Sequence, residues 1–446
     1  MSSIKVGKYS FDWTDRHLSA EETGPLRYEY DELGSNTVNI LQGMYRLKET
    51  AVGKGPPSRF DMYAALRDHH SEHETLSKLW TEVNTVPPWV DWHQIERGQK
   101  FFYRYAVANL TGFALQGFVG ENSAASGVVE VLVRTGGFST SLLRRRLLET
   151  FQFILQVTKD VNAIKPGSEG HISAVRARLL HGAVRERIMK LVEARPDYFN
   201  VEKFGVPINT LDSIHSISTF CCNHMWLQLP LMGVHPSQQE MADYIALFRY
   251  VGYLLATPDK YFASVSKAKA TMESMLLHER ELTDTSRVVG YNFVQCLQDM
   301  PPFNISADFI AAGSRMLNCD GFCDLLDFNR PGIVPYVCFR GLCWFVRGLA
   351  LAQQSCPCLD ETVVNYSRKL LHRAVITSKS GLGGASKLGF KYVPQLGKLT
   401  GRENNDRPAL VSLFSRPVES FFFCFFLVIV LSPLLFAGGI IFLFVL

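Results

Sequence analysis

The residues best suited to chemistry in this sequence lie in the segment VRARLLHGAVRER, residues 175–187. If this segment is a helix, Arg178 and Arg185 share one face with His181, because side chains three and four residues apart lie side by side. The neighbours of the histidine are small, Ala177 among them. Small neighbours leave room for a flat group, and two guanidinium groups can pair with two carboxylates. A haem is flat, carries two propionates and accepts histidine as an axial ligand, so the pattern is compatible with a haem site.

A second pattern precedes this segment in RRRLLETFQFILQVTKD, residues 144–160. Arg146 and Thr150 are four residues apart and share a helix face with apolar side chains, so they need hydrogen-bond partners if they are buried. Glu149 lies beside Thr150 and three residues from Arg146. From periodicity alone, the alternative is an amphipathic helix with a basic solvent face, in which the histidine has only a structural role.

The order R-x-x-x-T followed by R-x-x-H-x-x-x-R resembles the core signature of the rubber oxygenase (latex-clearing protein) and MpaB family. Further stretches resemble its fungal, MpaB-like branch, and the resemblance covers roughly residues 55–355; these stretches are 86–104, 113–138 and 206–255. The resemblance implies an all-helical fold that binds one haem b. It also implies that His181 is the proximal iron ligand and that Arg178, Arg185 and Ala177 line the cofactor.

The resemblance further implies that the protein cleaves a C=C bond of an isoprenoid (prenyl) chain with dioxygen, in terpenoid or meroterpenoid secondary metabolism. Arg146 and Thr150 would hold the haem or the oxygenated intermediate, and Glu130 or Glu149 would remove an allylic proton. Glu130 matches a glutamate base that the rubber-cleaving branch carries upstream, although an exposed helix carboxylate explains it equally well. That branch has a lysine at the position of Glu149, and its replacement weighs against a lysine-capped closed state and against polyisoprene as the substrate.

The C-terminal segment 421–446 contains no charged residue. A helix of this length would extend about 39 Å, which exceeds the roughly 30 Å hydrocarbon core of a bilayer. The preceding segment 379–420 contains six glycines and seven Lys/Arg against three Asp/Glu, which suits an anionic membrane surface. We therefore expect a C-terminal transmembrane anchor in the endoplasmic reticulum with a cytosolic catalytic domain. The outer mitochondrial membrane remains an alternative, and the N-terminus has no pattern of a signal peptide.

Apolar residues at spacings of three and four, interrupted by proline and glycine, predict an all-α fold with at most a minor sheet. We expect an irregular N-terminal wrap at 1–58, one helical haem-binding domain at 59–378, the linker at 379–420 and the anchor at 421–446. The expected helices are 59–84, 91–118, 122–135, 139–160, 169–193, 210–229, 237–255, 258–281, 285–298, 306–318, 333–353 and 360–376, and the expected N-caps are Asp91, Ser139, Ser306 and Asp360.

The net charge and the spacing of cysteines and histidines argue against several other functions. A net charge of +4 over 446 residues is too small to indicate nucleic-acid binding. The ten cysteines form no CxxC pair, so zinc and disulfide frameworks are disfavoured. His69 and His73 have the spacing of two metal ligands on one helix face, but no third ligand is evident. Two functions without catalysis remain open, a membrane-anchored haem carrier or sensor and a haem-free helical adaptor.

Overall fold

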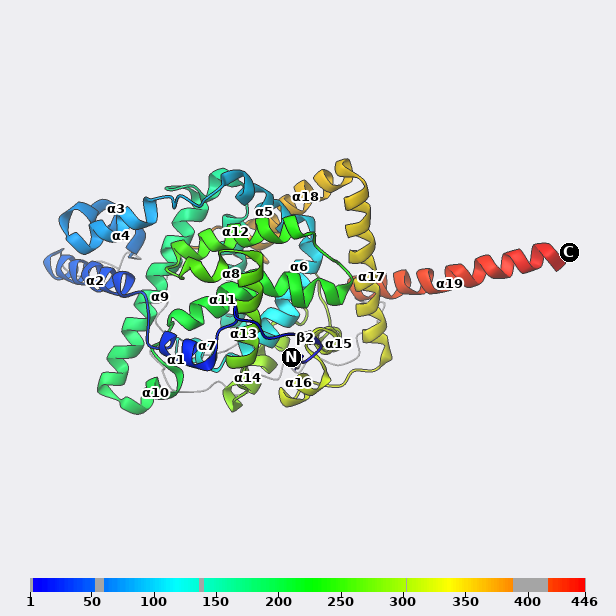
Figure 1. Ribbon diagram of the computed structural model, residues 1–446, viewed down its shortest axis with the longest axis horizontal. Helices are drawn as coiled ribbons and strands as arrows, with labels where there is room; N and C mark the ends of the chain where they lie inside the picture. Colours follow the sequence, from blue (N-terminus) through cyan, green and yellow to red (C-terminus); the bar gives the residue numbers. More distant parts are fainter. Residues whose placement is uncertain (1–2, 53–59, 136–139, 302, 388–415, 446) are drawn as a thin grey trace.

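A computed structural model of the chain describes residues 3–52, 60–135, 140–301, 303–387 and 416–445. Within these ranges the chain is almost entirely helical (Figure 1). The one sheet in the described ranges is the antiparallel hairpin of β1 (Ile4–Val6) and β2 (Tyr9–Phe11), in which Ile4 lies opposite Phe11. The predicted all-α fold with a minor sheet is therefore confirmed.

The helices of the first half of the described chain follow one another with short connections. They are α1 (Ala20–Leu26), α2 (Glu32–Val52), α3 (Met62–His69), η1 (His70–Glu72), α4 (Glu74–Asn84), α5 (Trp92–Arg104), α6 (Ala106–Gly112), η2 (Phe113–Asn122), α7 (Ser126–Arg134), α8 (Thr140–Val157), η3 (Val161–Ile164), α9 (Glu169–Ala194), η4 (Pro196–Tyr198) and α10 (Val201–Phe204).

The helices of the second half end in a long C-terminal helix. They are α11 (Thr210–Asn223), η5 (His224–Gln228), η6 (Pro230–Met232), α12 (Gln238–Leu254), η7 (Asp259–Phe262), α13 (Val265–His278), α14 (Asp284–Leu297), α15 (Ala307–Asn318), α16 (Asp320–Leu325), α17 (Ile333–Ser355), α18 (Pro357–His372), η8 (Arg373–Thr377) and α19 (Pro417–Val445). Of the elements labelled η, η2, η5 and η8 are π-helical.

Residues 3–52, here called the N-terminal arm, are more ordered than the expected irregular wrap. Ser19 begins α1 with a capping box, and α2 packs along α9. The contact between α2 and α9 is apolar, because Val38 and Leu41 join Val175 and Leu179 of α9 in one buried cluster. Because the overall composition of this segment is polar, the sequence does not readily indicate the narrow apolar face of α2 that contacts α9.

The helix ends agree in part with the expected N-caps. Asp91 and Ser306 are N-caps as expected, since their side chains accept hydrogen bonds from backbone N–H groups of the first turn. The prediction for Asp360 is wrong: α18 begins at Pro357, and Asp360 lies inside the helix. Ser139 lies outside the described residues. The single helix expected at 91–118 is divided into α5, α6 and the start of η2.

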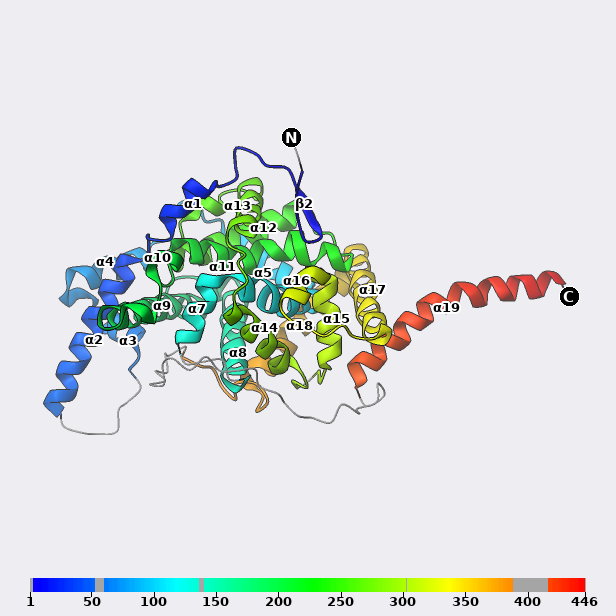
Figure 2. The ribbon, with the colours of Figure 1, turned by 90° about the horizontal axis from the view of Figure 1, so that it is seen from below.

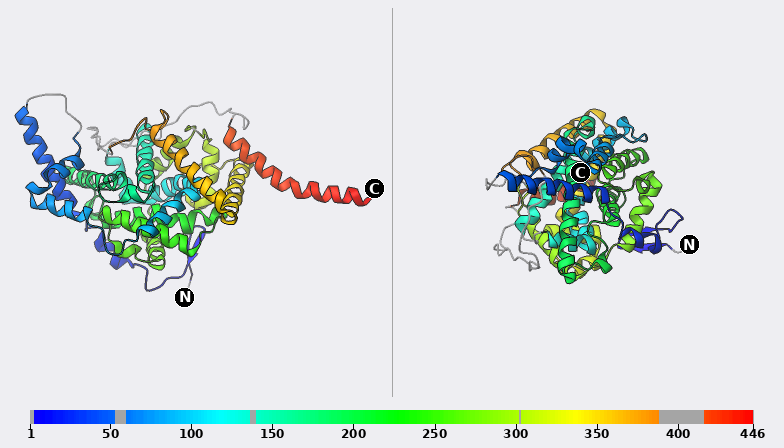
Figure 3. Two further views of the ribbon diagram at one scale, coloured as in Figure 1. Left: turned by 90° about the horizontal axis from the view of Figure 1, so that it is seen from above. Right: turned by 90° about the vertical axis from the view of Figure 1, so that its left-hand side faces the viewer.

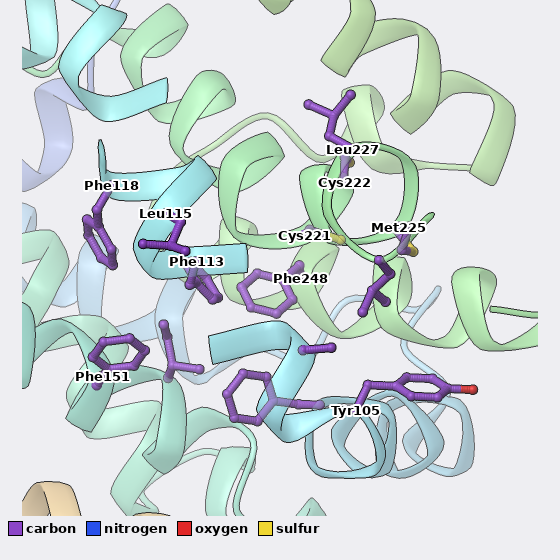
Figure 4. Packing of buried hydrophobic residues seen from close by; sticks show 14 of the residues in the cluster. Tyr105, Phe113, Leu115, Phe118, Phe151, Cys221, Cys222, Met225, Leu227 and Phe248 are labelled. Atoms are coloured by element: carbon purple, nitrogen blue, oxygen red, sulfur yellow. The ribbon is translucent and has the colours of Figure 1, made fainter. Parts of the chain in front are cut away.

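The largest core cluster joins η2, α8, α11, η5 and α12 and is rich in aromatic rings (Figure 4). Phe113 lies at its centre, with ring centroids 6.0 Å from Phe118, 6.1 Å from Phe151 and 5.0 Å from Phe220. Aromatic pairs at these separations add to the hydrophobic contribution of the rings. This core fixes α8, which carries one of the two patterns singled out in the sequence.

The C-terminal helix α19 starts against α17 and then extends away from the rest of the molecule (Figures 1–3). The two helices approach closely at Gly341 of α17, where the backbone carbonyl of Phe422 takes the place of a side chain. Beside it, the rings of Trp344 and Phe426 stack at 4.7 Å.

Length and apolar composition mark one helix of the described chain, α17, as able to cross a bilayer. Residues Pro417–Ser432 of α19 are also apolar, but this stretch is shorter than the 18 residues that a membrane-spanning helix requires. The transmembrane anchor expected at 421–446 is therefore not supported and stays a prediction. Most of the expected linker, residues 388–415, lies outside the described residues.

Candidate active site

His181 lies in the middle of α9, an uninterrupted helix that ends at Ala194, two residues before Pro196. Its side chain is half-buried and forms no hydrogen bond with any described residue. Burial and the positive charge of Arg185 lower the pKa of the imidazole to about 4, against the opposing effect of Asp31. The ring is therefore neutral at physiological pH, the form in which histidine binds a metal.

Arg178, one turn before His181, is buried and bound to two carboxylates. Its Nε and Nη2 donate to Asp31 Oδ2 and Oδ1 at 2.7 and 2.8 Å, and its Nη1 donates to Glu82 Oε1 at 2.6 Å. Asp31 belongs to the N-terminal arm, 147 residues away in the sequence. Both partners of this guanidinium are thus groups of the protein itself.

Arg185, one turn after His181, is also bound by the protein. Its Nε donates to the carbonyl of Pro207 at 3.1 Å and its Nη2 to that of Ile208 at 2.6 Å. Its Nη1 donates to Ser35 Oγ at 2.8 Å, and the guanidinium lies 5.0 Å from the ring centre of Tyr30. The two arginines therefore join α9 to the N-terminal arm and to the segment before α11.

The helix α8 carries the other pattern. Arg146 donates to the backbone carbonyls of Leu132 and Thr135 at 3.1 and 2.6 Å, at the end of α7. Thr150 is half-buried, and its hydroxyl has no hydrogen-bond partner among the described residues. Arg146 thus closes α8 onto α7, while the threonine one turn further along the same face keeps a free polar group.

The two candidate carboxylates are both paired. Glu149 Oε1 accepts from Arg145 Nε at 3.1 Å and from Ser386 Oγ at 2.8 Å. Glu130, on α7, forms an ion pair with Arg134 at 2.9 Å and accepts from Thr285 Oγ1 at 3.0 Å.

Contacts between α7, α8 and α9 join the three helices into a closed ring, here called the three-helix frame. Ser173 Oγ of α9 donates to Gln156 Oε1 of α8 at 2.7 Å. Arg146 ties α8 to α7, and Val131 of α7 packs with Val184 of α9. Along α9, residues 173, 177, 181 and 184 follow spacings of four, four and three, so Ala177 and His181 lie on the face that meets the other two helices. Ala177, His181 and Thr150 are all half-buried.

A small pocket opens on the arginine side of His181. The space accessible to the centre of a water molecule is about 10 Å³, close to the minimum that holds one water. It is lined by Asp31, Arg178, His181, Arg185, Ile208, Asn209, Thr210, Ser213, Leu255 and Ala256. Asp31 is not among the residues predicted from the sequence, because nothing in the local pattern of the N-terminal arm indicates a partner on α9.

His69 and His73 do not form a metal site with other described residues. His69 Nδ1 pairs with Glu72 at 2.6 Å, and His73 begins α4 by accepting a hydrogen bond from Thr75 N. No group of three potential ligands in a metal-binding arrangement is present in the described part of the chain.

The sequence also matches a known protein family. Residues 103–348 match the family described as the catalytic domain of ER-bound oxygenase mpaB/B′ and rubber oxygenase. The chain belongs to this family. All of the proposed site residues lie inside the matched range, whereas Asp31 lies outside it. The resemblance inferred from the sequence is thereby confirmed, and the chain belongs to a family of oxygenases.

The fold of this mpaB/rubber oxygenase family member is similar to a solved structure titled latex clearing protein LCP in the closed state. The two share 15% sequence identity with a TM-score of 0.56, and the alignment covers 94% of this chain and 95% of the other. At this identity the similarity concerns the fold alone. Among curated proteins, none matches the chain.

Proposed function

We propose that the protein is a haem b-dependent oxygenase that cleaves a C=C bond of an isoprenoid chain with dioxygen. The observation that carries this proposal is the imidazole of His181, which is recessed, neutral and without a hydrogen-bond partner among the described residues. His171 on the same helix pairs its ring nitrogens with protein groups, one of them with the carbonyl of Val83 at 2.7 Å. His224 is also unpaired among the described residues but is enclosed in the aromatic core, whereas His181 is half-buried and lines a pocket. His181 is thus suited to hold the haem iron, and Ala177, one turn before it, is a small residue.

Haem, when bound, would supply the iron that activates dioxygen. The residues of the three-helix frame would then position and shield the substrate. Thr150 can offer its free hydroxyl as a hydrogen-bond donor, and Arg146 holds α8 against α7 so that this hydroxyl keeps its place. Arg178 and Arg185 would act on the cofactor only indirectly, because the N-terminal arm and the segment before α11 already occupy their guanidinium groups.

A carboxylate would accept the allylic proton of the substrate. We favour Glu149 over Glu130, since it lies beside Thr150 and its partner Arg145 is exposed and easily displaced. Glu130 is buried and held by Arg134 and Thr285. Glu149→Gln should then lower kcat strongly with little change in KM, and Glu130→Gln should lower it less. The opposite order would assign the proton transfer to Glu130.

A lipophilic substrate also fits the C-terminal region. Exposed apolar side chains cover the described start of α19, and this helix extends away from the body (Figure 3). We propose that α19 anchors the enzyme in the membrane of the endoplasmic reticulum through residues 421–446, after the linker at 379–420, with the catalytic domain on the cytosolic side. A prenylated terpenoid or meroterpenoid would then be concentrated near the active site by its partition into the same bilayer.

Absorption spectra of the purified full-length protein test the cofactor assignment. We expect a Soret band after haem supplementation in the wild type, in the ferric state and in the ferrous state with carbon monoxide. His181→Ala should lose the band or shift it, and His171→Ala is the matched control on the same helix. An unchanged spectrum and iron content in the His181 variant would overturn the ligand assignment.

Oxygen consumption separates the enzyme from its two alternatives. Steady consumption with a prenylated substrate in detergent or vesicles, together with carbonyl products, supports the oxygenase. Haem binding without consumption would indicate a carrier or sensor. A protein that folds but binds no haem would indicate a helical adaptor.

A further inference from the structure

The pocket on the arginine side of His181 has a wall whose backbone is held in an unusual conformation. Two of its lining residues that are not glycine, Ile208 and Ala256, adopt positive φ angles of 55° and 62°. A β-branched residue such as isoleucine rarely adopts this conformation, because its side chain clashes with the backbone. Strain of this kind persists only where surrounding contacts enforce it, and here the carbonyl of Ile208 is held by Arg185.

Asp31 is the one carboxylate that lines this pocket. Its Oδ1 accepts from Arg178 Nη2 and from the backbone N–H of Gly34 at 2.8 and 3.0 Å. Its Oδ2 accepts a single described bond, from Arg178 Nε at 2.7 Å, and a carboxylate oxygen has capacity for a second. Asp31 is therefore fixed in position and still able to accept a hydrogen bond from the pocket.

A histidine that ligates a metal through one ring nitrogen donates a hydrogen bond from the other, and this second bond sets the orientation and basicity of the ring. No described protein group accepts such a bond from His181 directly. The pocket has space for about one water molecule between His181 and its polar lining. A single water there would have a donor in the imidazole and an acceptor in Asp31.

We propose that Asp31, through one ordered water, is the positioning residue of His181, so that the N-terminal arm is part of the active site. This inference rests on the proposed haem ligation. The carboxylate would orient the ring and increase its basicity, and it would do so from outside the part of the chain that matches the family.

The test compares Asp31→Asn with Glu82→Gln in the haem-loaded full-length protein. Both variants remove one carboxylate partner of Arg178, but only Asp31 lines the pocket. Asp61→Asn is a second control, since Asp61 pairs with Arg176 of the same helix at 2.6 Å and does not line the pocket. Haem affinity, the reduction potential and the iron–histidine stretching frequency of the ferrous state are measured.

Asp31→Asn should bind haem at least about tenfold more weakly, as removal of such outer partners commonly does. Its reduction potential should move to a more positive value, because a negative charge near the iron is lost, and its iron–histidine frequency should fall. Glu82→Gln and Asp61→Asn should keep the wild-type frequency and potential. If Asp31→Asn does not fold, Asp31→Glu moves the carboxylate by one methylene and should show smaller shifts in the same direction.

The two proposals fail differently. A wild-type protein that folds but binds no haem overturns both the proposed function and the role of Asp31. A haem-loaded Asp31→Asn protein with the frequency and potential of the wild type overturns the role of Asp31 alone. Equal shifts in Asp31→Asn and Glu82→Gln also overturn it, because they would trace the effect to Arg178 and not to the pocket.

Discussion

Asp360 on α18 and Arg104 on α5 form a two-point ion pair that joins helices 256 residues apart in the sequence. Arg104 Nε and Nη2 lie 2.8 and 2.6 Å from the two carboxylate oxygens of Asp360, and Lys100 Nζ lies 3.0 Å from one of them. Burial favours a raised pKa for Asp360, but these cationic donors outweigh it and hold the pKa below its usual value. The carboxylate is therefore ionised at neutral pH and fixed between the two helices.

Removing this carboxylate should destabilise the fold. We expect Asp360→Ala to lower the free energy of unfolding by about 3 kcal/mol, because Arg104 is left partly buried with Glu240 as its remaining carboxylate partner. Urea unfolding followed by circular dichroism measures the change. Glu74→Gln removes the exposed pair with Lys78 and should leave the urea midpoint almost unchanged. Equal effects of the two variants would contradict this account.

Gly98 should not tolerate a side chain. A Cβ at this position of α5 would overlap the backbone carbonyl of Asp243 on α12. We expect Gly98→Ala to cost about 1–3 kcal/mol of stability, since two packed helices must move apart. Gly43 of α2 has no atom near its Cβ position, so Gly43→Ala should instead stabilise the protein by about 0.5–1 kcal/mol. Thermal unfolding of both variants distinguishes close packing from helix propensity.

Gly341 should determine whether α19 stays attached to α17. A Cβ at Gly341 would overlap the carbonyl of Phe422, whereas Gly348 on the same helix has open space. Gly341→Ala should therefore loosen the start of α19 and expose the Trp344–Phe426 stack to solvent. Limited proteolysis near residue 417 and quenching of tryptophan fluorescence should both increase in this variant. In Gly348→Ala they should match the wild type.

Asp212 should make stability depend on pH. Burial and the nearby Glu279 raise the pKa of Asp212 to about 7. Between pH 4 and 7 the unfolded chain has lost this proton and the folded chain keeps it, so stability falls as the pH rises through this range. Asp212→Asn carries no such proton and should gain stability relative to the wild type by about 3 kcal/mol from pH 4 to 7, with only a small further gain above pH 7. Parallel urea profiles at pH 5 and 8 would show that the carboxyl titrates normally.

Local signals in the sequence predict the helices well and the long-range partners poorly. The apolar periodicity predicts one helix at 169–193, and α9 runs from Glu169 to Ala194. Periodicity does not distinguish a π-helix from an α-helix over one or two turns, so η2 and η5 were read as parts of ordinary helices.

In the candidate site, too, the sequence predicts which residues share a helix face but not their distant partners. The shared face of Arg178, His181 and Arg185 follows from helical spacing alone. Helical spacing does not predict which acidic groups pair with the arginines. In the structure Asp31 and Glu82 bind Arg178, so any carboxylate of a ligand would have to compete with them. The expected helix 360–376 makes Asp360 its N-cap, yet in the structure Asp360 pairs with Arg104 of a distant helix.

The distance in sequence between Asp31 and Arg178 has a consequence for synthesis of the protein. Ribosomes add about 5–20 residues per second, so the 147 residues between these two side chains require roughly 7–30 s. During that interval the apolar stripe of α2, with Val38 and Leu41, has no α9 to cover it. Until α9 emerges, the nascent arm therefore exposes apolar surface of the kind that chaperones bind.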